Sequence, residues 1–213
     1  MHVSVIIPVY NGEKFVQRAI RSAVDQNFPR KQFEIIVVDD GSTDNTVEVI
    51  QPFKNFVRIL RHEKNMGLAA SRNTGIKAAR GQYIVNLDAD DYLHQDFLYI
   101  EIMFLSLNED FDAVSCDYFI VDEHEKHLER RNATEYPIAC GIMFRMEQLI
   151  DIGLYSENFL VREEEDLRQR FLNKYRIHHI PLPLYRYRKH DDNITNNQEL
   201  MKEYKKKFHE KHF

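Results

Sequence analysis

The chain has 213 residues, of which 43% are hydrophobic and 30% charged, and its formal net charge is -5. This length supports one sizeable core and favours one domain. The acidic balance argues against a general nucleic-acid-binding protein. Two cysteines, Cys116 and Cys140, are too few for a disulfide framework, so we expect reduced thiols. No apolar run approaches the roughly 18 residues that span a bilayer, and no signal peptide precedes the first predicted strand, so we expect a cytoplasmic protein.

The first 91 residues alternate apolar runs with segments of helical periodicity. Strands are predicted at 3–10, 33–38, 57–60 and 83–88, and helices at 13–26, from Ser42 or Asp44 to about 53, and at 67–80. Nearly continuous Val and Ile, as in 33–38, is typical of strands that are buried on both faces of a parallel sheet. Alternating strands and helices therefore predict an α/β domain with a Rossmann-like, mostly parallel central sheet flanked by helices.

The pattern is less regular after residue 92. We predict helices at 95–107 and 163–173, strands at 111–121 and 138–144, an extended segment at 177–187, and a Lys-rich helix at 198–213. A charged stretch, 122–131, separates two of these elements. One domain, 1–213, is expected, with a nucleotide-binding half (1–91), an acceptor half (92–197) and a basic C-terminal helix (198–213).

Asp88 and Asp90 close the last apolar run of the first half. If the strand continues through them, the two carboxylates point to the same side, because side chains alternate along a strand. Two like charges side by side repel unless a cation lies between or beside them, and carboxylate oxygens suit Mg²⁺ or Mn²⁺. These ions commonly bind phosphate groups as well. An acidic turn or a helix cap is the alternative interpretation.

Polar clusters follow three of the predicted strands. They are Tyr10-Asn11-Gly12, Asp39-Asp40-Gly41-Ser42 and Asp88-Ala89-Asp90-Asp91. Ligands of open α/β sheets bind at the carboxyl ends of the strands, where these clusters can converge. A simple turn is the alternative for the second cluster, since Asp and Gly are turn residues.

Four segments together resemble the family 2 glycosyltransferases, which have the GT-A fold. They are the opening Val3-Ser4-Val5-Ile6-Ile7-Pro8-Val9-Tyr10-Asn11, the Val-Asp-Asp-Gly-Ser-Thr-Asp at 38–44, the Asn65-x-Gly67-x-x-x-Ser71-Arg72-Asn73-x-Gly75 segment, and Asp-Ala-Asp-Asp at 88–91. The resemblance runs from residue 3 to about 195. It implies an inverting, metal-dependent transferase that moves a sugar from a nucleotide-sugar, usually a UDP-sugar, to a hydroxyl acceptor in polysaccharide or glycoconjugate synthesis.

The same resemblance assigns roles to the donor side. Tyr10 would stack on the base, Asp40 would hydrogen-bond the edge of the base, and Asp88 would lie near the ribose or the ion. Asp90 would bind Mn²⁺ or Mg²⁺. Pro8 and Arg72 would line the nucleotide pocket.

The general base is expected at the start of the helix predicted at 163–173. Counting back from Arg170 places the carboxylate of the family on Glu164, where the family more often has Asp, and Asp166 stays open as the second candidate. A carboxylate is ionised at neutral pH and can accept the proton of an acceptor hydroxyl. Acidic residues also favour a helix start through the helix dipole, which is the structural alternative.

The C-terminal part carries two basic segments. The run Arg186-Tyr187-Arg188-Lys189-His190 resembles a family segment that closes over the diphosphate, and His190 is a candidate metal ligand; a solvated face is the alternative. The Lys-rich tail could lie on an anionic membrane surface at its inner face, or be an exposed helix in solvent. The expected partners are a nucleotide-sugar donor and a saccharide or lipid-linked saccharide acceptor, and no nucleic acid.

Other classes of protein fit the sequence less well. A dinucleotide-dependent oxidoreductase needs Gly-x-Gly-x-x-Gly after the first strand, where Pro8-Val9-Tyr10-Asn11-Gly12 stands. A sugar-phosphate nucleotidyltransferase needs a Gly-rich, Arg-bearing loop there. A receiver domain shares only the paired aspartates. An inactive nucleotide-sugar-binding module with the same fold remains the main alternative, and the intact acidic residues argue against it.

Overall fold

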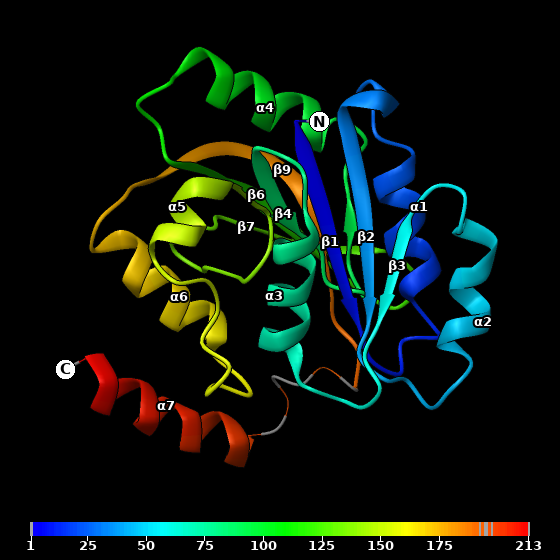
Figure 1. The fold of residues 1–213 in the computed structure, drawn as a ribbon. Coiled ribbons are helices and arrows are strands. Elements are labelled where there is room, and N and C mark those ends of the chain that lie inside the picture. Colours follow the sequence, from blue (N-terminus) through cyan, green and yellow to red (C-terminus); the bar gives the residue numbers. More distant parts are fainter. Residues whose placement is uncertain (1, 192, 194–195, 197, 213) are drawn as a thin grey trace.

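A computed structural model describes residues 2–191, 193, 196 and 198–212 (Figure 1). Its strands form one sheet in the order β3-β2-β1-β4-β8-β6-β9-β5, with β7 paired to β6. The strands are β1 Val3–Val9, β2 Phe33–Asp39, β3 Arg58–Arg61, β4 Tyr83–Asn86, β5 Tyr92–Leu93, β6 Ala113–Val121, β7 His127–Arg131, β8 Ile142–Arg145 and β9 Ile177–Arg188. The α/β class and the flanked central sheet are confirmed.

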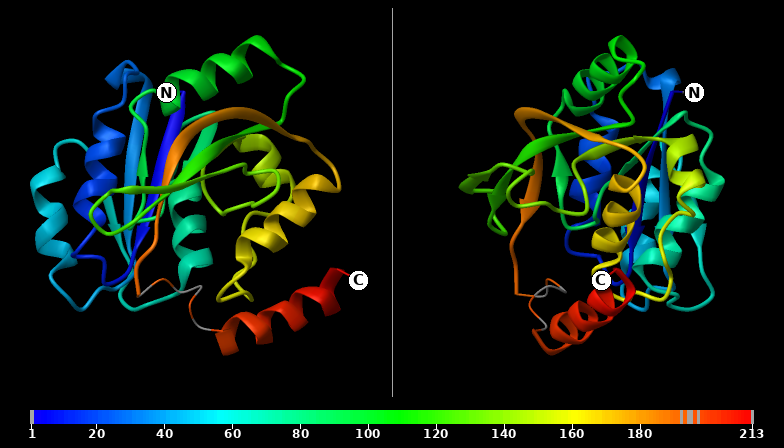
Figure 2. Two further views of the ribbon diagram at one scale, coloured as in Figure 1. Left: turned by 180° about the vertical axis from the view of Figure 1, so that it is seen from behind. Right: turned by 90° about the vertical axis from the view of Figure 1, so that its left-hand side faces the viewer.

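Seven α-helices and two short 3₁₀ turns accompany the sheet in the described part of the chain. The helices are α1 Val16–Val24, α2 Thr46–Ile50, α3 Leu68–Ala78, α4 Phe97–Leu107, α5 Met146–Asp151, α6 Glu163–Leu172 and α7 Gln198–His212, and the turns are η1 Arg30–Gln32 and η2 Gln51–Phe53. Apolar side chains of α1, α2 and α4 pack on one face of the sheet, and those of α3, α5 and α6 on the other. Figure 2 shows both layers from behind and from the side.

The two halves of the sheet differ in strand direction. The pairs β1–β2, β1–β4 and β2–β3 are parallel, as predicted for the first 91 residues. Beyond β4, the pairs β4–β8, β6–β8, β6–β7 and β5–β9 are antiparallel, and only β6–β9 is parallel. The charged stretch 122–131, predicted as a break, contains β7, because its exposed residues pair with the edge of β6.

The strand predicted at 83–88 is shorter than expected. β4 ends at Asn86, and the backbone then turns, with the Asp91 N–H donating to the Asp88 carbonyl over 3.1 Å. The expectation that Asp88 and Asp90 share one face of a strand is therefore wrong, because neither residue lies in the strand. Any common role of the two carboxylates has to come from the turn.

The central strand β1 is buried on both faces, which explains its run of aliphatic residues. Val5 and Ile7 belong to the core on the α1 side, and Ile6 belongs to the core on the α3 side. Gly75 of α3 lies directly against Ile6: a Cβ at this glycine would come within 2.4 Å of the Ile6 Cγ2 atom. The glycine thus lets α3, which carries Arg72, approach the sheet closely.

We expect Gly75→Ala to destabilise the fold by about 1–3 kcal/mol, the usual range for an overpacked core. The stiff β-branched side chain of Ile6 cannot move away without changing its rotamer. Helix propensity alone predicts that the variant is more stable than the wild type, since Ala is favoured over Gly in a helix by about 1 kcal/mol. Urea unfolding measures the difference.

The matched control is the exposed Lys77 of the same helix. There, Lys77→Ala should be more stable than Lys77→Gly by about 1 kcal/mol. If Ala were also more stable than Gly at position 75, close packing of α3 on β1 would not be the reason for this glycine.

Candidate active site

The parallel strands β1, β2 and β4 bring their carboxyl ends to one edge of the sheet, at the bottom of the view in Figure 1. Tyr10 follows β1 with about half of its side chain exposed, 47%, so one ring face is open to a ligand. Pro8, by contrast, lies within β1 and is buried, paired in register with Val38 of β2. The structure therefore brings Tyr10 to the edge and keeps Pro8 inside the sheet.

The aspartate pair after β2 holds loops together. The buried Asp40 carboxylate accepts hydrogen bonds from the Met66 N–H and the Gly67 N–H, both at 2.8 Å, and contacts the His62 Nδ1 atom at 2.6 Å. Asp39 accepts from the Ser42 N–H at 3.0 Å. A carboxylate has about four acceptor positions. Asp40 thus fixes the loop that starts α3.

Arg72 is the buried centre of the site. Its guanidinium contacts the Asp88 Oδ1 atom at 2.7 Å and the Glu163 carboxylate, and it lies 5.2 Å from the centre of the Tyr155 ring. Burial alone would lower the pKa of Arg72, but Asp88 and Glu163 outweigh it and raise that pKa well above the ordinary value. One fixed positive charge therefore joins the end of β4 to the start of α6.

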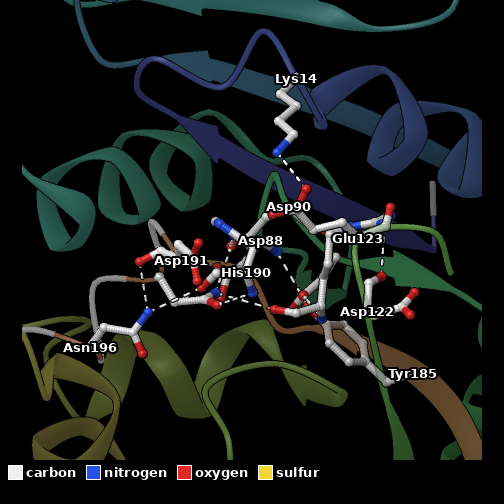
Figure 3. A network of polar contacts seen from close by, with 12 residues as sticks. Lys14, Asp88, Asp90, Asp122, Glu123, Tyr185, His190, Asp191 and Asn196 are labelled. Atoms are coloured by element: carbon white, nitrogen blue, oxygen red, sulfur yellow. Dashed lines mark hydrogen bonds and ion pairs between the residues drawn. The ribbon is translucent and has the colours of Figure 1, made fainter. Parts of the chain in front are cut away.

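The three aspartates after β4 have different partners, several of which are visible in Figure 3. Asp88 pairs with Arg72, while the Asp90 Oδ2 atom lies 2.9 Å from the His190 Nε2 atom. Asp91 is buried and accepts from the Tyr185 hydroxyl and from the Arg188 N–H, both at 2.7 Å. Burial, followed by the charges of Asp90 and Asp88, raises the pKa of Asp91 well above its usual range. Asp91 is thus a structural residue, and Asp88 and Asp90 remain open to a ligand.

The metal prediction rests on Asp90 and His190. An oxygen and an imidazole nitrogen facing each other suit a divalent ion such as Mn²⁺, and the buried His190 Nδ1 atom has no hydrogen-bond partner among the described residues. Asp88 is held by Arg72, and no set of three His, Cys, Asp or Glu side chains in the described part of the chain is arranged as a metal site. The donor set fits an ion that takes its other ligands from phosphate oxygens and water.

The acidic start of α6 divides into three environments. Glu163 is buried against Arg72. Glu164 lines the cavity described below, and burial, followed by the charge of Glu163, raises its pKa to about 7. Asp166 is fully buried and pairs with Arg170 at 2.8 Å, and also with two residues of α7. Of the two base candidates, only Glu164 thus lines the cavity.

A cavity of about 190 Å³ collects the predicted residues Arg72, Asp88, Asp90 and Glu164. Asp91 and Glu163 also line it, and Cys140, Tyr187 and Met201 are among the residues that the second half of the chain adds to its wall. The other predicted residues do not line it: Tyr10 and Asp40 lie along the strand edge, and His190 contacts Asp90 from outside the cavity wall. Tyr185, Asp91 and Glu163 were not predicted; their roles depend on partners 94 and 91 residues away along the chain.

Comparison with known proteins gives one consistent family. The model of "Glycosyl transferase family 2" matches residues 4–171. An uncharacterized glycosyltransferase of Rickettsia conorii is 42% identical over 177 residues, which cover 77% of this chain and 28% of the relative. The poly(ribitol-phosphate) beta-N-acetylglucosaminyltransferase TarS of Staphylococcus aureus is 37% identical over 101 residues, covering 46% of this chain and 18% of TarS. The chain spans about a quarter of the length of the Rickettsia relatives.

Solved structures show the same GT-A fold. S. aureus TarS 1-349 in complex with UDP-GlcNAc superposes with a TM-score of 0.81 at 24% identity, covering 92% of this chain and 61% of that one. The mannosyltransferase PcManGT from Pyrobaculum calidifontis in complex with GDP-Man and Mn²⁺ gives a TM-score of 0.73 at 20% identity, over 90% of this chain and 58% of that one. At these identities the likeness concerns the fold. No helix of the described residues is long and apolar enough to cross a bilayer.

We expect Arg72→Met to destabilise the fold by about 3–5 kcal/mol, because it leaves Asp88 and Glu163 without their shared buried counter-charge. In the double variant Arg72→Met/Glu163→Gln, part of that loss should return, since one of the two orphaned charges is gone. Urea unfolding of the four proteins of this cycle gives the coupling free energy.

Lys14→Met is the control, because the Lys14–Glu123 pair is exposed and should contribute less than about 1 kcal/mol. If Arg72→Met cost no more than Lys14→Met, Arg72 would not hold the two halves together.

Proposed function

The chain belongs to glycosyltransferase family 2, and we propose that it transfers a sugar from a UDP-sugar to an acceptor hydroxyl with inversion at the anomeric carbon. The observation that carries this proposal is the convergence of Arg72, Asp88, Asp90 and Glu164 on one cavity at the carboxyl edge of the parallel strands. The site thus combines a fixed cation, a candidate metal ligand and a candidate base. The relatives named as sugar transferases and the UDP-GlcNAc complex of TarS support the choice of donor.

The donor would lie across the strand edge. A nucleotide-sugar is larger than a cavity of about 190 Å³, so we place only its diphosphate and sugar there and its base outside, toward the exposed ring of Tyr10. Stacking on that ring does not depend on which base is bound and requires no movement of the strand. Asp40 would bind the edge of the base, Asp88 would lie near the ribose or the ion, and Arg72 would attract the diphosphate. Pro8 contributes to this pocket only by supporting β1.

Asp90 and His190 are the residues that would hold Mg²⁺ or Mn²⁺, as their facing oxygen and nitrogen atoms fit such an ion. When bound, the ion supplies positive charge that offsets the charge developing on the departing diphosphate. Arg72 supplies a second, permanent charge beside Asp88 at the same cavity. We propose that the two together stabilise the leaving group.

We propose Glu164 as the general base. A carboxylate with a pKa of about 7 is well matched to accepting a proton near neutral pH. Glu164 takes the proton of the acceptor hydroxyl as its oxygen bonds to the anomeric carbon, and UDP leaves with the bonding electrons from the opposite face, which inverts the centre. Asp166, the other candidate, is neutralised by Arg170, Lys211 and His212 and would have to break these pairs to reach a substrate.

The acceptor half supports a narrower proposal about partners. We propose a saccharide or lipid-linked saccharide as the acceptor, at the cytoplasmic face of a membrane. In α7, Tyr204 packs against Phe159, and Phe208 packs against the same small core, so its apolar side is used inside the protein. A membrane contact through α7 would therefore rest on its exposed lysines, such as Lys202 and Lys206, and depend on salt.

The donor site can be tested by thermal unfolding. We expect UDP and Mn²⁺ together to stabilise the protein by about 2.7 kcal/mol at 100 times the dissociation constant. For a domain of this size the melting temperature should rise by about 5–10 °C. The rise should disappear with EDTA and in Asp90→Asn, and persist in Asp110→Asn, whose side chain is exposed and distant in sequence from the site.

A rise with GDP or another nucleotide, but not with UDP, would correct the donor. A rise with UDP alone that EDTA and Asp90→Asn leave unchanged would contradict the metal site. A folded protein that responds to no nucleotide would overturn the proposed activity, whereas UDP binding without sugar transfer to any acceptor would identify an inactive binding module.

The base can be tested through the pH dependence of transfer. The rate should rise from pH 5, reach half of its plateau near pH 7 and level off about one pH unit higher, because Glu164 acts only when it is deprotonated and its pKa is raised to about 7. Glu164→Gln should abolish transfer and leave UDP binding intact. UDP release from UDP-sugars in the presence of saccharide acceptors measures transfer, and thermal unfolding with UDP measures binding.

Glu165→Gln is the neighbouring control and should keep transfer, with a pH profile displaced only slightly to lower pH, because the charge of Glu165 is a minor cause of the raised pKa of Glu164. Near-normal turnover of Glu164→Gln, together with a loss in Asp166→Asn at a temperature where that variant is folded, would move the role of base to Asp166.

A further inference from the structure

A second cavity, of about 520 Å³, lies on the opposite face of β9 from the candidate active site. Neighbouring residues of a strand point to opposite sides. Accordingly, Tyr187 lines the first cavity, and Arg186 lines the second. The wall of the second cavity also includes Arg18 of α1, Tyr92 of β5, and Glu125 and His127 at the hairpin of β6 and β7, which projects from the body of the protein in the side view of Figure 2.

Arg186 faces this cavity with an uncompensated charge. Its guanidinium lies 5.2 Å from the centre of the Phe119 ring and donates to the Pro183 carbonyl at 2.6 Å. No carboxylate of the described residues lies within ion-pair distance of it. Burial, and then the nearby charge of Arg18, lowers the pKa of Arg186. A partly buried guanidinium without a counter-charge is costly, so an anion would stabilise it.

The opposite wall adds a second guanidinium. Arg18 stacks over the Tyr92 ring at 4.0 Å, and its Nε atom lies 2.8 Å from Glu125. Glu125 is shared, because the buried Arg188 also contacts it, at 3.4 Å. One carboxylate therefore serves two arginines here, and Arg186 has none. Asp25 is the other acidic residue of the wall, so the lining holds two arginines and two carboxylates, and Arg186 is the arginine without a carboxylate partner among the described residues.

We propose that this cavity binds an oxyanion of the phosphate class between Arg18 and Arg186. Guanidinium groups present paired N–H donors that match phosphate oxygens, and the stacking of both groups on aromatic rings keeps them in place. The ligand is either free phosphate or a phosphodiester group of a larger molecule. The site is independent of the proposed transfer reaction, since it shares no lining residue with the first cavity.

An NMR titration of the arginine Nε–Hε signals tests this proposal on the wild-type chain at pH 7 and constant ionic strength. The probes are inorganic phosphate and diethyl phosphate, with potassium chloride as the reference. We expect the signals of Arg18 and Arg186 to move and saturate with at least one probe, independently of any shift of the Arg72 signal in the candidate active site. Saturation by phosphate alone indicates a free phosphate ligand, and saturation by the diester indicates a phosphodiester.

Two variants localise the binding. Arg186→Gln should weaken the binding of the effective probe at least about tenfold, which corresponds to 1.4 kcal/mol. Arg21→Gln removes the same charge from an exposed position of α1, the helix that carries Arg18, and should change the binding less than about twofold. Unchanged melting temperatures establish that both variants are folded.

Four outcomes would overturn the proposal. Potassium chloride could reproduce the shifts, the Arg72 signal could move in place of those of Arg18 and Arg186, or Arg186→Gln could bind as tightly as the wild type. Saturation by neither probe would overturn it as well. The wild-type titration gives its answer even if a variant fails to fold, and none of these results depends on whether UDP-sugars are used.

Discussion

The ion pairs of Arg72 are the constraint on which the rest of the site depends. Burying a guanidinium is costly unless it is paired and hydrogen-bonded, and Asp88 and Glu163 provide its partners from two parts of the chain that lie 75 residues apart. This contact sets the distance between the end of β4 and the start of α6. The donor edge and the proposed base are therefore positioned by the same charge. Gly75 supports the same arrangement, since it lets the helix that carries Arg72 lie close against β1.

Once Arg72 is in place, the acidic residues around it differ because of their surroundings. Glu163 and Asp88 are held by the guanidinium, Asp91 is buried under Tyr185, and Asp166 is enclosed by cations of α6 and α7. Glu164 lines the cavity beside Glu163, and burial, followed by the charge of Glu163, raises its pKa to about 7. The helix dipole explains why acidic residues gather at this helix start, but the packing partners explain why their chemistry differs.

Much of the parallel half could be predicted from the sequence, because aliphatic runs such as β1 and β2 are local patterns with one physical interpretation. The antiparallel half could not, since short strands such as β5 and β7 form only where a long strand offers free backbone groups. In the site, Asp90 and His190 were predicted and lie together, whereas the partner of Arg72 in α6 was not predicted. No local pattern connects positions 72 and 163, so their pairing has to be seen in three dimensions. The turn after Asn86 was also missed, because Asp-x-Asp is equally compatible with a strand and with a turn.

Strand β9 shows how one element can separate two kinds of chemistry. Tyr185 reaches the aspartate turn and Tyr187 lines the first cavity, while Arg186 points to the second cavity. Arg188 spans both regions, because its guanidinium donates to the Asp90 carbonyl at 2.8 Å and also contacts Glu125. A basic run in the sequence is thus divided by strand alternation into groups that act on different sides of the sheet. Of the run at 186–190, Tyr187 and the side chain of His190, which contacts Asp90, therefore lie on the side of the candidate active site, whereas Arg186 lines the second cavity.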